Sequence, residues 1–316
     1  MSELLVVGAG QMAGAYVSVL KALSQPFKVV GRGEASAARF RDEHDVDVST
    51  GGLEEYLSYS PAPASAIVAV PIEELADSTR LLAQAGTERV LVEKPGALNS
   101  NELRALIKSI SPTQARVWVA YNRRFFQSTL TARDVIQQDG GVTSFSFEFS
   151  EWVDRVLASP TILKVKDAWV VANSSHVLDL AFHLGGVPTE LSSWTRGSLP
   201  WHQSGDRFAG AGLTDSGALF SYRSDWSSPG RWRVEMNTRS RRLLLSPLET
   251  VQQMVHGSLV FESIEINTDL DQAFKPGIYF QTRAFTEGLY DDLCPISEQL
   301  QRMYLYERIA GYPANP

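Results

Sequence analysis

The sequence is short of three features that define whole classes of protein. Among its 316 residues it has one cysteine, Cys294, so no disulfide can form within the chain, and we expect a small packed side chain in a helix near the end. It has no run of about 18 apolar residues and no basic leader with a cleavage site, which favours a cytoplasmic protein. It also lacks excess positive charge, and the formal net charge of −7 argues against nucleic acid or anionic membranes as main partners.

What the sequence does have begins at its first apolar run. Leu4–Val7 leads directly into Gly8-Ala9-Gly10-Gln11-Met12-Ala13-Gly14, and apolar residues then recur at helical spacing. A strand, a glycine turn and a helix in this order are typical of a dinucleotide site, although glycines also form ordinary turns. The helix start would offer N–H groups to the pyrophosphate. The candidate cofactor residues in this turn are Gly8, Gly10, Gln11 and Met12.

The second expected strand, residues 27–30, ends near an arginine. A site for NAD usually has an acidic residue there to bind both ribose hydroxyls, about twenty residues beyond the glycine turn. This chain has Arg32, whose guanidinium matches a 2′-phosphate, and Ser36 and Arg39 could assist. The pattern favours NADP. The alternative is NAD, with Glu34 at the ribose and Arg32 in solvent.

Apolar runs alternate with helical patterns through the first 122 residues. The expected strands are 4–7, 27–30, 66–71, 89–92 and 116–120, and the expected helices include 35–44, 72–85 and 100–110. This alternation predicts an α/β fold that begins with a Rossmann doubly wound parallel sheet. Ligands of such a sheet bind beyond the carboxyl ends of its strands.

The pattern changes after an expected helix at 129–138. Alternation places Phe145, Phe147 and Phe149 on one face of a strand, and further alternating stretches lie near 191–194, 207–213, 218–224, 231–236 and 242–245. These stretches predict a mostly antiparallel, open-faced sheet, with helices at 174–184, 278–289 and 297–309. We therefore expect a Rossmann dinucleotide-binding domain over 1–122 and an α+β domain for substrate binding and oligomerisation over 123–316. The terminal helices could pack back on the first domain, and the open sheet suits a homo-oligomer.

Two residues stand out as candidates for catalysis. Lys94 follows a parallel strand, and Pro95 restricts it to extended conformations. Near a bound nicotinamide, a lysine can stabilise the alkoxide that develops on a hydroxyl being oxidised. His176 is expected in the first turn of a helix capped by serines, where the dipole keeps the imidazole neutral and able to accept a proton. Asp179, three residues on, could orient the ring or bind substrate.

Tryptophans and arginines beyond residue 122 are candidate substrate contacts. Trp152, Trp169 and Trp201 could stack on a sugar or a base, although tryptophans in a sheet are more often core. Arginines at 231, 233, 239, 241 and 242 form a basic patch, which is either a solvated or oligomeric face or a clamp for a diphosphate. We expect a small sugar-like substrate.

The motifs together resemble the Gfo/Idh/MocA oxidoreductases, the group of glucose-fructose oxidoreductase and inositol dehydrogenase. The resemblance rests on residues 8–14, Glu93-Lys94-Pro95, Tyr121-Asn122-Arg123-Arg124-Phe125 and the histidine helix, and it extends over nearly the whole chain. It implies that Lys94 is the catalytic lysine touching the nicotinamide and that His176 is the acid/base, with no metal. It also implies that the cofactor is lined by Val70, Pro71, Glu93 and Asn122, with Arg124 supporting that edge.

One position departs from the family pattern. Many members carry an aspartate four residues before the histidine, whereas this chain has Ala172 there and Asn173 next to it. Asn173 can bind a hydroxyl but cannot take a proton. Either Lys94 and His176 suffice, or Asp167 or Asp179 replaces the carboxylate, or the protein is an inefficient dehydrogenase. The alternatives to a sugar dehydrogenase are a catalytically impaired dinucleotide sensor or scaffold and a non-redox lyase or hydrolase that retains the cofactor.

Arg32→Ala tests the cofactor assignment. We expect the dissociation constant for NADPH to rise by about tenfold or more, with little change for NADH, because only NADPH carries the phosphate that a guanidinium binds. Intrinsic fluorescence titrations of both proteins measure this. Equal losses of affinity for NADPH and NADH would contradict a contact between Arg32 and the 2′-phosphate.

Overall fold

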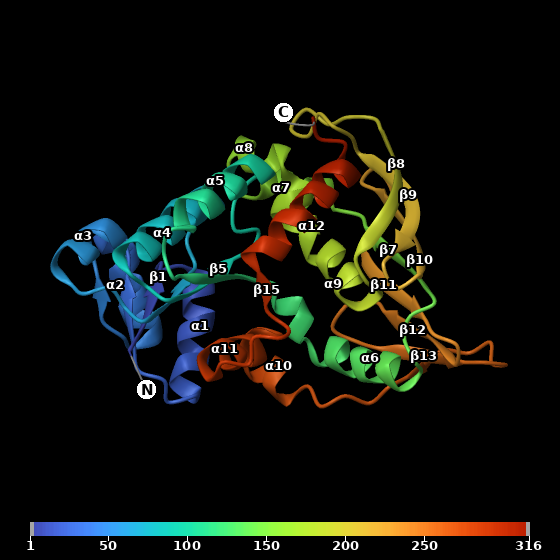
Figure 1. Ribbon diagram of the computed structural model, residues 1–316, viewed down its shortest axis with the longest axis horizontal. Coiled ribbons are helices and arrows are strands. Elements are labelled where there is room, and N and C mark those ends of the chain that lie inside the picture. Colours follow the sequence, from blue (N-terminus) through green and yellow to red (C-terminus); the bar gives the residue numbers. More distant parts are fainter. Residues whose placement is uncertain (1–2, 314–316) are drawn as a thin grey trace. The chain divides into compact units, whose positions relative to one another are not determined.

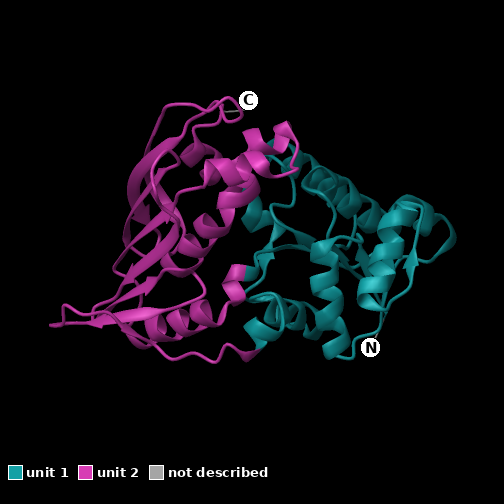
Figure 2. Cartoon of the chain, turned by 180° about the vertical axis from the view of Figure 1, so that it is seen from behind, with its two compact units in different colours: residues 1–122, 270–301 teal, residues 123–269, 302–316 magenta. Residues whose placement is uncertain are grey.

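The computed structural model describes residues 3–313, which divide into two compact units (Figure 2). Unit 1 consists of the chain up to Asn122 together with Leu270–Gln301. Unit 2 consists of Arg123–Asp269 together with the chain from Arg302 onward. The first unit is therefore assembled from two separate stretches of sequence.

Unit 1 is built on a sheet with the strand order β15-β6-β5-β4-β1-β2-β3 (Figure 1). Every neighbouring pair is parallel except β15 with β6. The strands are β1 (Leu4–Val7), β2 (Phe27–Val30), β3 (Val48–Ser49), β4 (Ser65–Val68), β5 (Arg89–Glu93), β6 (Arg116–Ala120) and β15 (Cys294–Pro295). The central strands β1 and β4 are buried along their whole length, as expected for a sheet covered on both faces.

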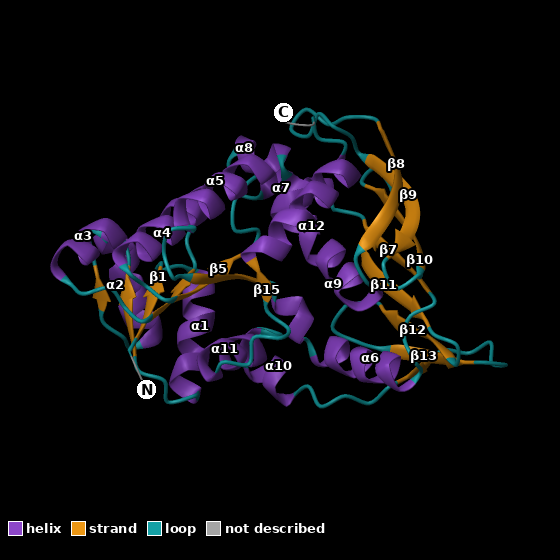
Figure 3. Ribbon diagram, viewed as in Figure 1, coloured by secondary structure: helices purple, strands orange, loops and turns teal. Residues whose placement is uncertain are grey.

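Helices cover both faces of this sheet (Figure 3), with α4 and α5 on one side and α1 and α11 on the other. They are α1 (Gln11–Ala22), α2 (Glu34–His44), α3 (Gly52–Tyr59), α4 (Ile72–Ala85), α5 (Ser100–Ile110), α10 (Asp269–Ala273), α11 (Ile278–Glu287) and α12 (Ile296–Ala310). The last of these begins in unit 1 and continues into unit 2. The strands expected at 4–7, 27–30 and 116–120 and the helices expected at 72–85 and 100–110 are confirmed.

Unit 2 contains a sheet with the order β14-β13-β12-β11-β7-β10-β9-β8. Its neighbouring pairs are antiparallel except β7 with β10, which is parallel. The strands are β7 (Ser144–Phe149), β8 (Pro188–Arg196), β9 (Arg207–Thr214), β10 (Leu219–Asp225), β11 (Trp232–Asn237), β12 (Arg241–Leu245), β13 (Gln252–Val255) and β14 (Glu262–Ser263). The mostly antiparallel sheet expected from the sequence is confirmed.

Alternation along β7 builds the core of unit 2. Phe145, Phe147 and Phe149 are buried on one face, where Phe182 of α9 (Ser175–Gly185) packs edge-on against the first two rings. The other face carries exposed side chains along β9 and β10. The remaining helical segments are the 3-10 helix η1 (Asn122–Phe125), α6 (Gln127–Gln138), α7 (Val153–Ala158), α8 (Leu163–Asp167) and the π-helical turn η2 (Val170–Ser174).

Cys294 does not lie in a helix as expected. It lies in the short strand β15, which pairs antiparallel with β6, and its side chain is buried. The expectation of a small packed side chain is confirmed, but the helical assignment is wrong because edge pairing overrides local pattern in so short a segment. Over residues 3–313, no helix is long and apolar enough to cross a membrane.

A buried histidine links two parts of unit 2. His202 Nδ1 lies 2.7 Å from the Gly205 carbonyl oxygen, and Nε2 lies 2.9 Å from the Tyr312 hydroxyl. An imidazole with its proton on Nδ1 satisfies both contacts, donating to Gly205 and accepting from Tyr312. Burial lowers the pKa of His202, opposed by the Gly205 carbonyl. The fold thus favours the neutral ring.

This histidine makes the stability of unit 2 depend on pH. The pKa of His202 in the folded protein is below its ordinary value of 6.5. The neutral imidazole therefore makes its full contribution to the free energy of unfolding above about pH 6.5. As the pH falls below that value, the unfolded chain binds the proton first and stability is lost. We expect His202→Gln to lower the free energy of unfolding at pH 7.5. On acidification, the free energy of unfolding should fall less for this variant than for the wild type.

Urea unfolding of both proteins at pH 7.5 and 5.5 measures the effect. The exposed His256 offers a matched control, and His256→Gln should leave the pH dependence of the wild type unchanged. A difference in unfolding free energy between wild type and His202→Gln that is the same at both pH values would contradict the assignment.

Candidate active site

The glycine turn of unit 1 excludes a side chain at Gly8 but leaves open space at Gly10. Gly8 has φ of +119°, and a Cβ there would lie 2.3 Å from the Ala69 carbonyl oxygen. Only glycine avoids both the strained conformation and this clash. Gly10 differs, because a Cβ built on it would meet no heavy atom of the described chain within 4 Å. The space above Gly10 is therefore open.

Helix α1 starts at the edge of that space. Gly10 is its N-cap and, within the described residues, no side chain caps it and its first turn has no acidic residue. Its first N–H groups and the positive end of its dipole therefore suit an anion. Gln11 is exposed and Met12 is half-buried in this first turn. A backbone cradle, an uncapped helix start and open space fit the diphosphate of a dinucleotide.

A cleft of about 290 Å³ brings together five of the predicted cofactor residues of unit 1. It extends from the glycine turn past the ends of β2 and β4, and its lining includes Gly8, Gly10, Arg32, Val70, Pro71 and Glu74. The carboxyl ends of these parallel strands meet at one edge, which explains why residues far apart in sequence share the cleft.

Arg32 lies at the end of β2 and is 71% exposed. Its Nη2 lies 2.7 Å from Oε1 of Glu74, so an acidic partner from α4 already holds it. Glu34 accepts a hydrogen bond of 2.6 Å from the Thr50 hydroxyl. Arg32 therefore lies at the expected place, but its guanidinium would have to bind a phosphate while it is also paired with the Glu74 carboxylate.

A buried hydrogen-bond chain supports the turn that carries Lys94. The Tyr16 hydroxyl donates to Glu93 Oε1 at 2.6 Å and accepts from Gln281 Nε2 at 3.0 Å. Burial raises the pKa of the Glu93 carboxyl, while Tyr16 and the charges of Lys94 and Lys275 oppose that rise. Burial likewise raises the pKa of Tyr16 well above its ordinary value. Glu93 is therefore held in place immediately before Lys94.

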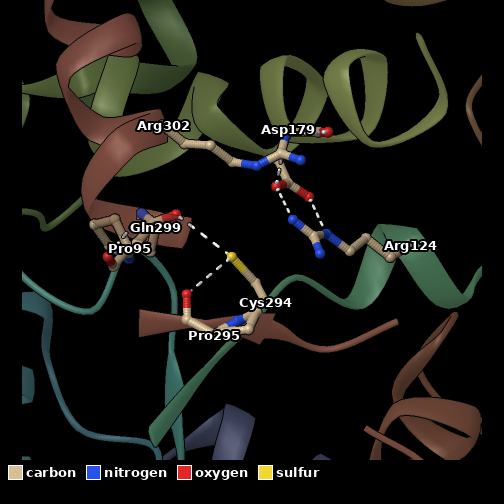
Figure 4. Close-up of polar contacts among 7 residues, drawn as sticks. All are labelled: Pro95, Arg124, Asp179, Cys294, Pro295, Gln299 and Arg302. Carbon is tan, nitrogen blue, oxygen red and sulfur yellow. Dashed lines mark hydrogen bonds and ion pairs between the residues drawn. The ribbon is translucent and has the colours of Figure 1, made fainter. Parts of the chain in front are cut away.

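The other side of this turn is also fixed. Gln299 Nε2 donates to the Pro95 carbonyl oxygen at 3.0 Å (Figure 4). The Lys94–Pro95 peptide bond is cis. Cys294 Sγ lies 4.0 Å from Gln299 Oε1. Asn122, at the end of β6, donates from Nδ2 to the Pro276 carbonyl oxygen at 2.9 Å. Residues from the later part of the chain therefore support the predicted cofactor edge.

His176 lies in unit 2, in the second position of α9, and is buried. It lies in the first turn of α9, as expected, but α9 is not a separate helix capped by serines. The π-helical turn η2 leads directly into α9, and neither Ser174 nor Ser175 is a side-chain cap. The dipole argument for a neutral ring is therefore wrong in its premise. What remains is a buried imidazole whose centroid lies 6.0 Å from the ring of Trp232.

Sequence reasoning missed Glu151, which organises the start of this helix. It is 3% exposed, and its Oε1 accepts from Asn173 Nδ2 at 3.0 Å, Ser174 Oγ at 2.7 Å and Trp232 Nε1 at 3.2 Å. Its Oε2 lies 3.3 Å from Arg231 Nη1. Burial raises the pKa of the Glu151 carboxyl, opposed chiefly by Ser174 and Arg231. The available signal was a carboxylate just beyond the alternating strand that ends at Phe149.

Asp179 lies within a buried ion-pair cluster (Figure 4). Arg124 donates to it from Nε at 2.8 Å and from Nη2 at 2.7 Å, and Arg302 Nη1 lies 3.6 Å from Oδ1. A bidentate pair of this kind fixes both side chains. The other proposed carboxylate, Asp167, is exposed at the end of α8. The carboxylate that accepts a hydrogen bond from Asn173 is that of Glu151, and neither Asp167 nor Asp179 takes this place.

The tryptophans divide between surface and core. Trp152 is 42% exposed, and the guanidinium carbons of Arg155 and Arg231 lie 4.1 and 5.2 Å from its ring centroid. Trp201 is buried and stacks on Trp226 at 5.7 Å, which agrees with the expectation that most are core. Trp152 therefore has the exposure that a ligand contact requires, in a setting rich in positive charge.

Comparison with known proteins agrees with the fold. Residues 3–121 match the Gfo/Idh/MocA family model, described as an oxidoreductase family with an NAD-binding Rossmann fold. No curated protein sequence matches the chain.

Solved structures match almost the whole chain. Levoglucosan dehydrogenase in complex with NADH is 15% identical, with a TM-score of 0.80, over 98% of this chain and 96% of that one. UDP-N-acetylglucosamine 3-dehydrogenase of Acidithiobacillus ferrooxidans is 14% identical, with a TM-score of 0.75, over 98% and 97%. An NAD-binding oxidoreductase of Klebsiella pneumoniae is 16% identical, with a TM-score of 0.77, over 98% and 95%. These similarities confirm the fold class expected from the sequence.

Proposed function

Since this chain belongs, through residues 3–121, to the Gfo/Idh/MocA oxidoreductase family, we propose that it transfers hydride between a nicotinamide cofactor and a CH–OH carbon of a sugar, cyclitol or nucleotide sugar. The observation that carries the proposal is the edge of unit 1. There the open space above Gly10 meets an uncapped helix start, and Lys94 stands on a turn fixed by Glu93 and Pro95.

The chain's own residues would hold the cofactor and prepare the hydroxyl. The N–H groups at the start of α1 would bind the diphosphate, while Val70 and Pro71 would line the adenosine side of the cleft. A bound nicotinamide supplies the hydride acceptor. Lys94 would donate a hydrogen bond to the substrate oxygen and stabilise the negative charge that grows there.

The proton of the substrate hydroxyl would pass to an imidazole nitrogen of His176 as the C–H hydride leaves. Reduction of the corresponding ketone would use the same residues in reverse. Asn173 would assist by accepting a hydrogen bond, because its Nδ2 is engaged by Glu151 and this fixes the orientation of the amide. The substrate contacts that we propose are therefore Asn173 and Trp152, with Asp179 placed as an anchor for Arg124.

The substrate class rests on the types of residue and on the neighbours. Levoglucosan and a UDP-linked amino sugar are the compounds named for two structures that share this fold. The exposed Trp152, with Arg155 and Arg231 beside it, suits a sugar ring or an anionic group. We propose NADP as the preferred cofactor on the basis of Arg32, and the Arg32–Glu74 pair makes NAD the competing choice.

Lys94→Met tests the reaction. We expect turnover to fall by at least a hundredfold, because methionine keeps the length of the side chain but neither donates a hydrogen bond nor carries charge. Levoglucosan, UDP-N-acetylglucosamine and myo-inositol, each offered with NAD⁺ and NADP⁺, form a first panel, followed by nicotinamide absorbance. NADH titration of both proteins should give similar affinities if only chemistry is lost.

The other outcomes separate the alternatives. Tight cofactor binding with no turnover of a wide polyol panel would indicate a sensor or scaffold. Product formed without any net change in nicotinamide absorbance would indicate a lyase or hydrolase. Full turnover by Lys94→Met would rule out its proposed role.

We also propose that the open face of the sheet in unit 2 forms a homo-oligomer. Exposed Ala209, Ala211 and Leu219 lie on adjacent strands of this face, near the exposed Trp194. Exposed apolar side chains on an open sheet face support a subunit contact there. Light scattering should give a mass above that of one chain, and Ala211→Glu should return it to the monomer. A monomeric wild type would end this proposal.

A further inference from the structure

The segment that returns to unit 1 near residue 275 carries a cation to the cofactor edge. Lys275 comes just before α11, far in sequence from the glycine turn, yet its Nζ lies 2.9 Å from Met12 Sδ. Met12 is the second residue of α1, the helix whose start faces the open space above Gly10. The ammonium group therefore lies at the first turn of the helix expected to hold the diphosphate.

Several contacts fix the turn that carries this lysine. The Gly277 N–H donates to Asp271 Oδ1 at 2.8 Å, and the Pro276 carbonyl accepts from Asn122 Nδ2 at 2.9 Å. One turn further, Gln281 donates to Tyr16 of α1, which in turn donates to Glu93. Helix α11 packs against α1, and the two lie side by side in Figure 1. The backbone at Lys275 is thus tied to the strand ends and to α1.

The ammonium group of Lys275 contacts Met12 through a weak acceptor. Lys275 is exposed, and a thioether sulfur is a weak hydrogen-bond acceptor. Its charge also reaches Glu93, where it opposes the effect of burial on that carboxyl. A lysine held by its backbone, with its ammonium group beside an anion-binding helix start, is arranged to meet a negatively charged ligand.

We propose that Lys275 is a cofactor-binding residue that pairs with the diphosphate of the dinucleotide and so completes the site from outside the Rossmann segment. The inference rests on the proposed function, since it takes the ligand at α1 to be a nicotinamide dinucleotide. A diphosphate carries two negative charges, and the helix start alone supplies partial positive charge. A lysine adds a full charge that can follow the ligand because its stem is flexible.

The test is a set of fluorescence titrations of the full chain with NADH and with ADP-ribose, which retains the diphosphate but lacks nicotinamide. We expect Lys275→Met to raise both dissociation constants by about tenfold, because a charge-assisted hydrogen bond is lost. Lys275→Arg should restore most of the affinity. Raising the salt concentration should narrow the difference between wild type and Lys275→Met, since the contact is partly exposed.

Lys108→Met is the matched control, because Lys108 is an exposed lysine of unit 1 in the last turn of α5. It should leave both affinities unchanged, and circular dichroism should show that each variant keeps its fold. Equal affinities for wild type and Lys275→Met, or equal losses in Lys275→Met and Lys108→Met, would overturn the inference while leaving the proposed function intact. A wild-type protein that binds neither NADH nor NADPH would overturn both.

Discussion

The carboxylate of Glu93 is the group on which the structure of unit 1 depends most. It is half-buried at the end of strand β5, where it accepts a hydrogen bond from Tyr16 of the first helix, and Tyr16 accepts one from Gln281 of the returning segment. Three parts of the chain are thereby joined by two hydrogen bonds. A carboxylate partly removed from water is destabilising without such partners, so the position of Glu93 depends on both α1 and α11.

Glu151 plays a similar part in unit 2. It lies two residues beyond β7, it is buried, and it accepts hydrogen bonds from side chains of η2 and β11. In both units a glutamate at or just beyond the end of a strand fixes the segment that carries a candidate catalytic residue, Lys94 in one and His176 in the other. Such residues restrain the candidate groups through hydrogen bonds rather than by direct participation in the reaction.

The sequence allowed much of the fold to be predicted but less of the site. The strand ends of the Rossmann sheet, with Lys94 and the glycine turn, follow from local patterns because each lies at a predictable end of a buried run. Glu151 and Lys275 were missed because their contacts are with residues distant in the sequence. Glu151 contacts Asn173, 22 positions away, and Lys275 contacts Met12, 263 positions away, and no local pattern indicates either contact. The helix start at His176 was misjudged for the opposite reason. Two serines looked like caps, but Ser174 donates to Glu151 and the helix continues through a π turn.

The split composition of unit 1 has a consequence for synthesis on the ribosome. The edge of β6 is covered by β15, and the Tyr16–Glu93 pair is completed by Gln281, so neither is finished until nearly the whole chain has been made. Until then β6 presents an open strand edge, the kind of surface that pairs with other chains. Unit 2 is encoded almost entirely between the two halves of unit 1, and it would be available to fold first. A chain shortened before residue 270 would leave the nucleotide-binding half unclosed, although every residue matched by the family model would still be present.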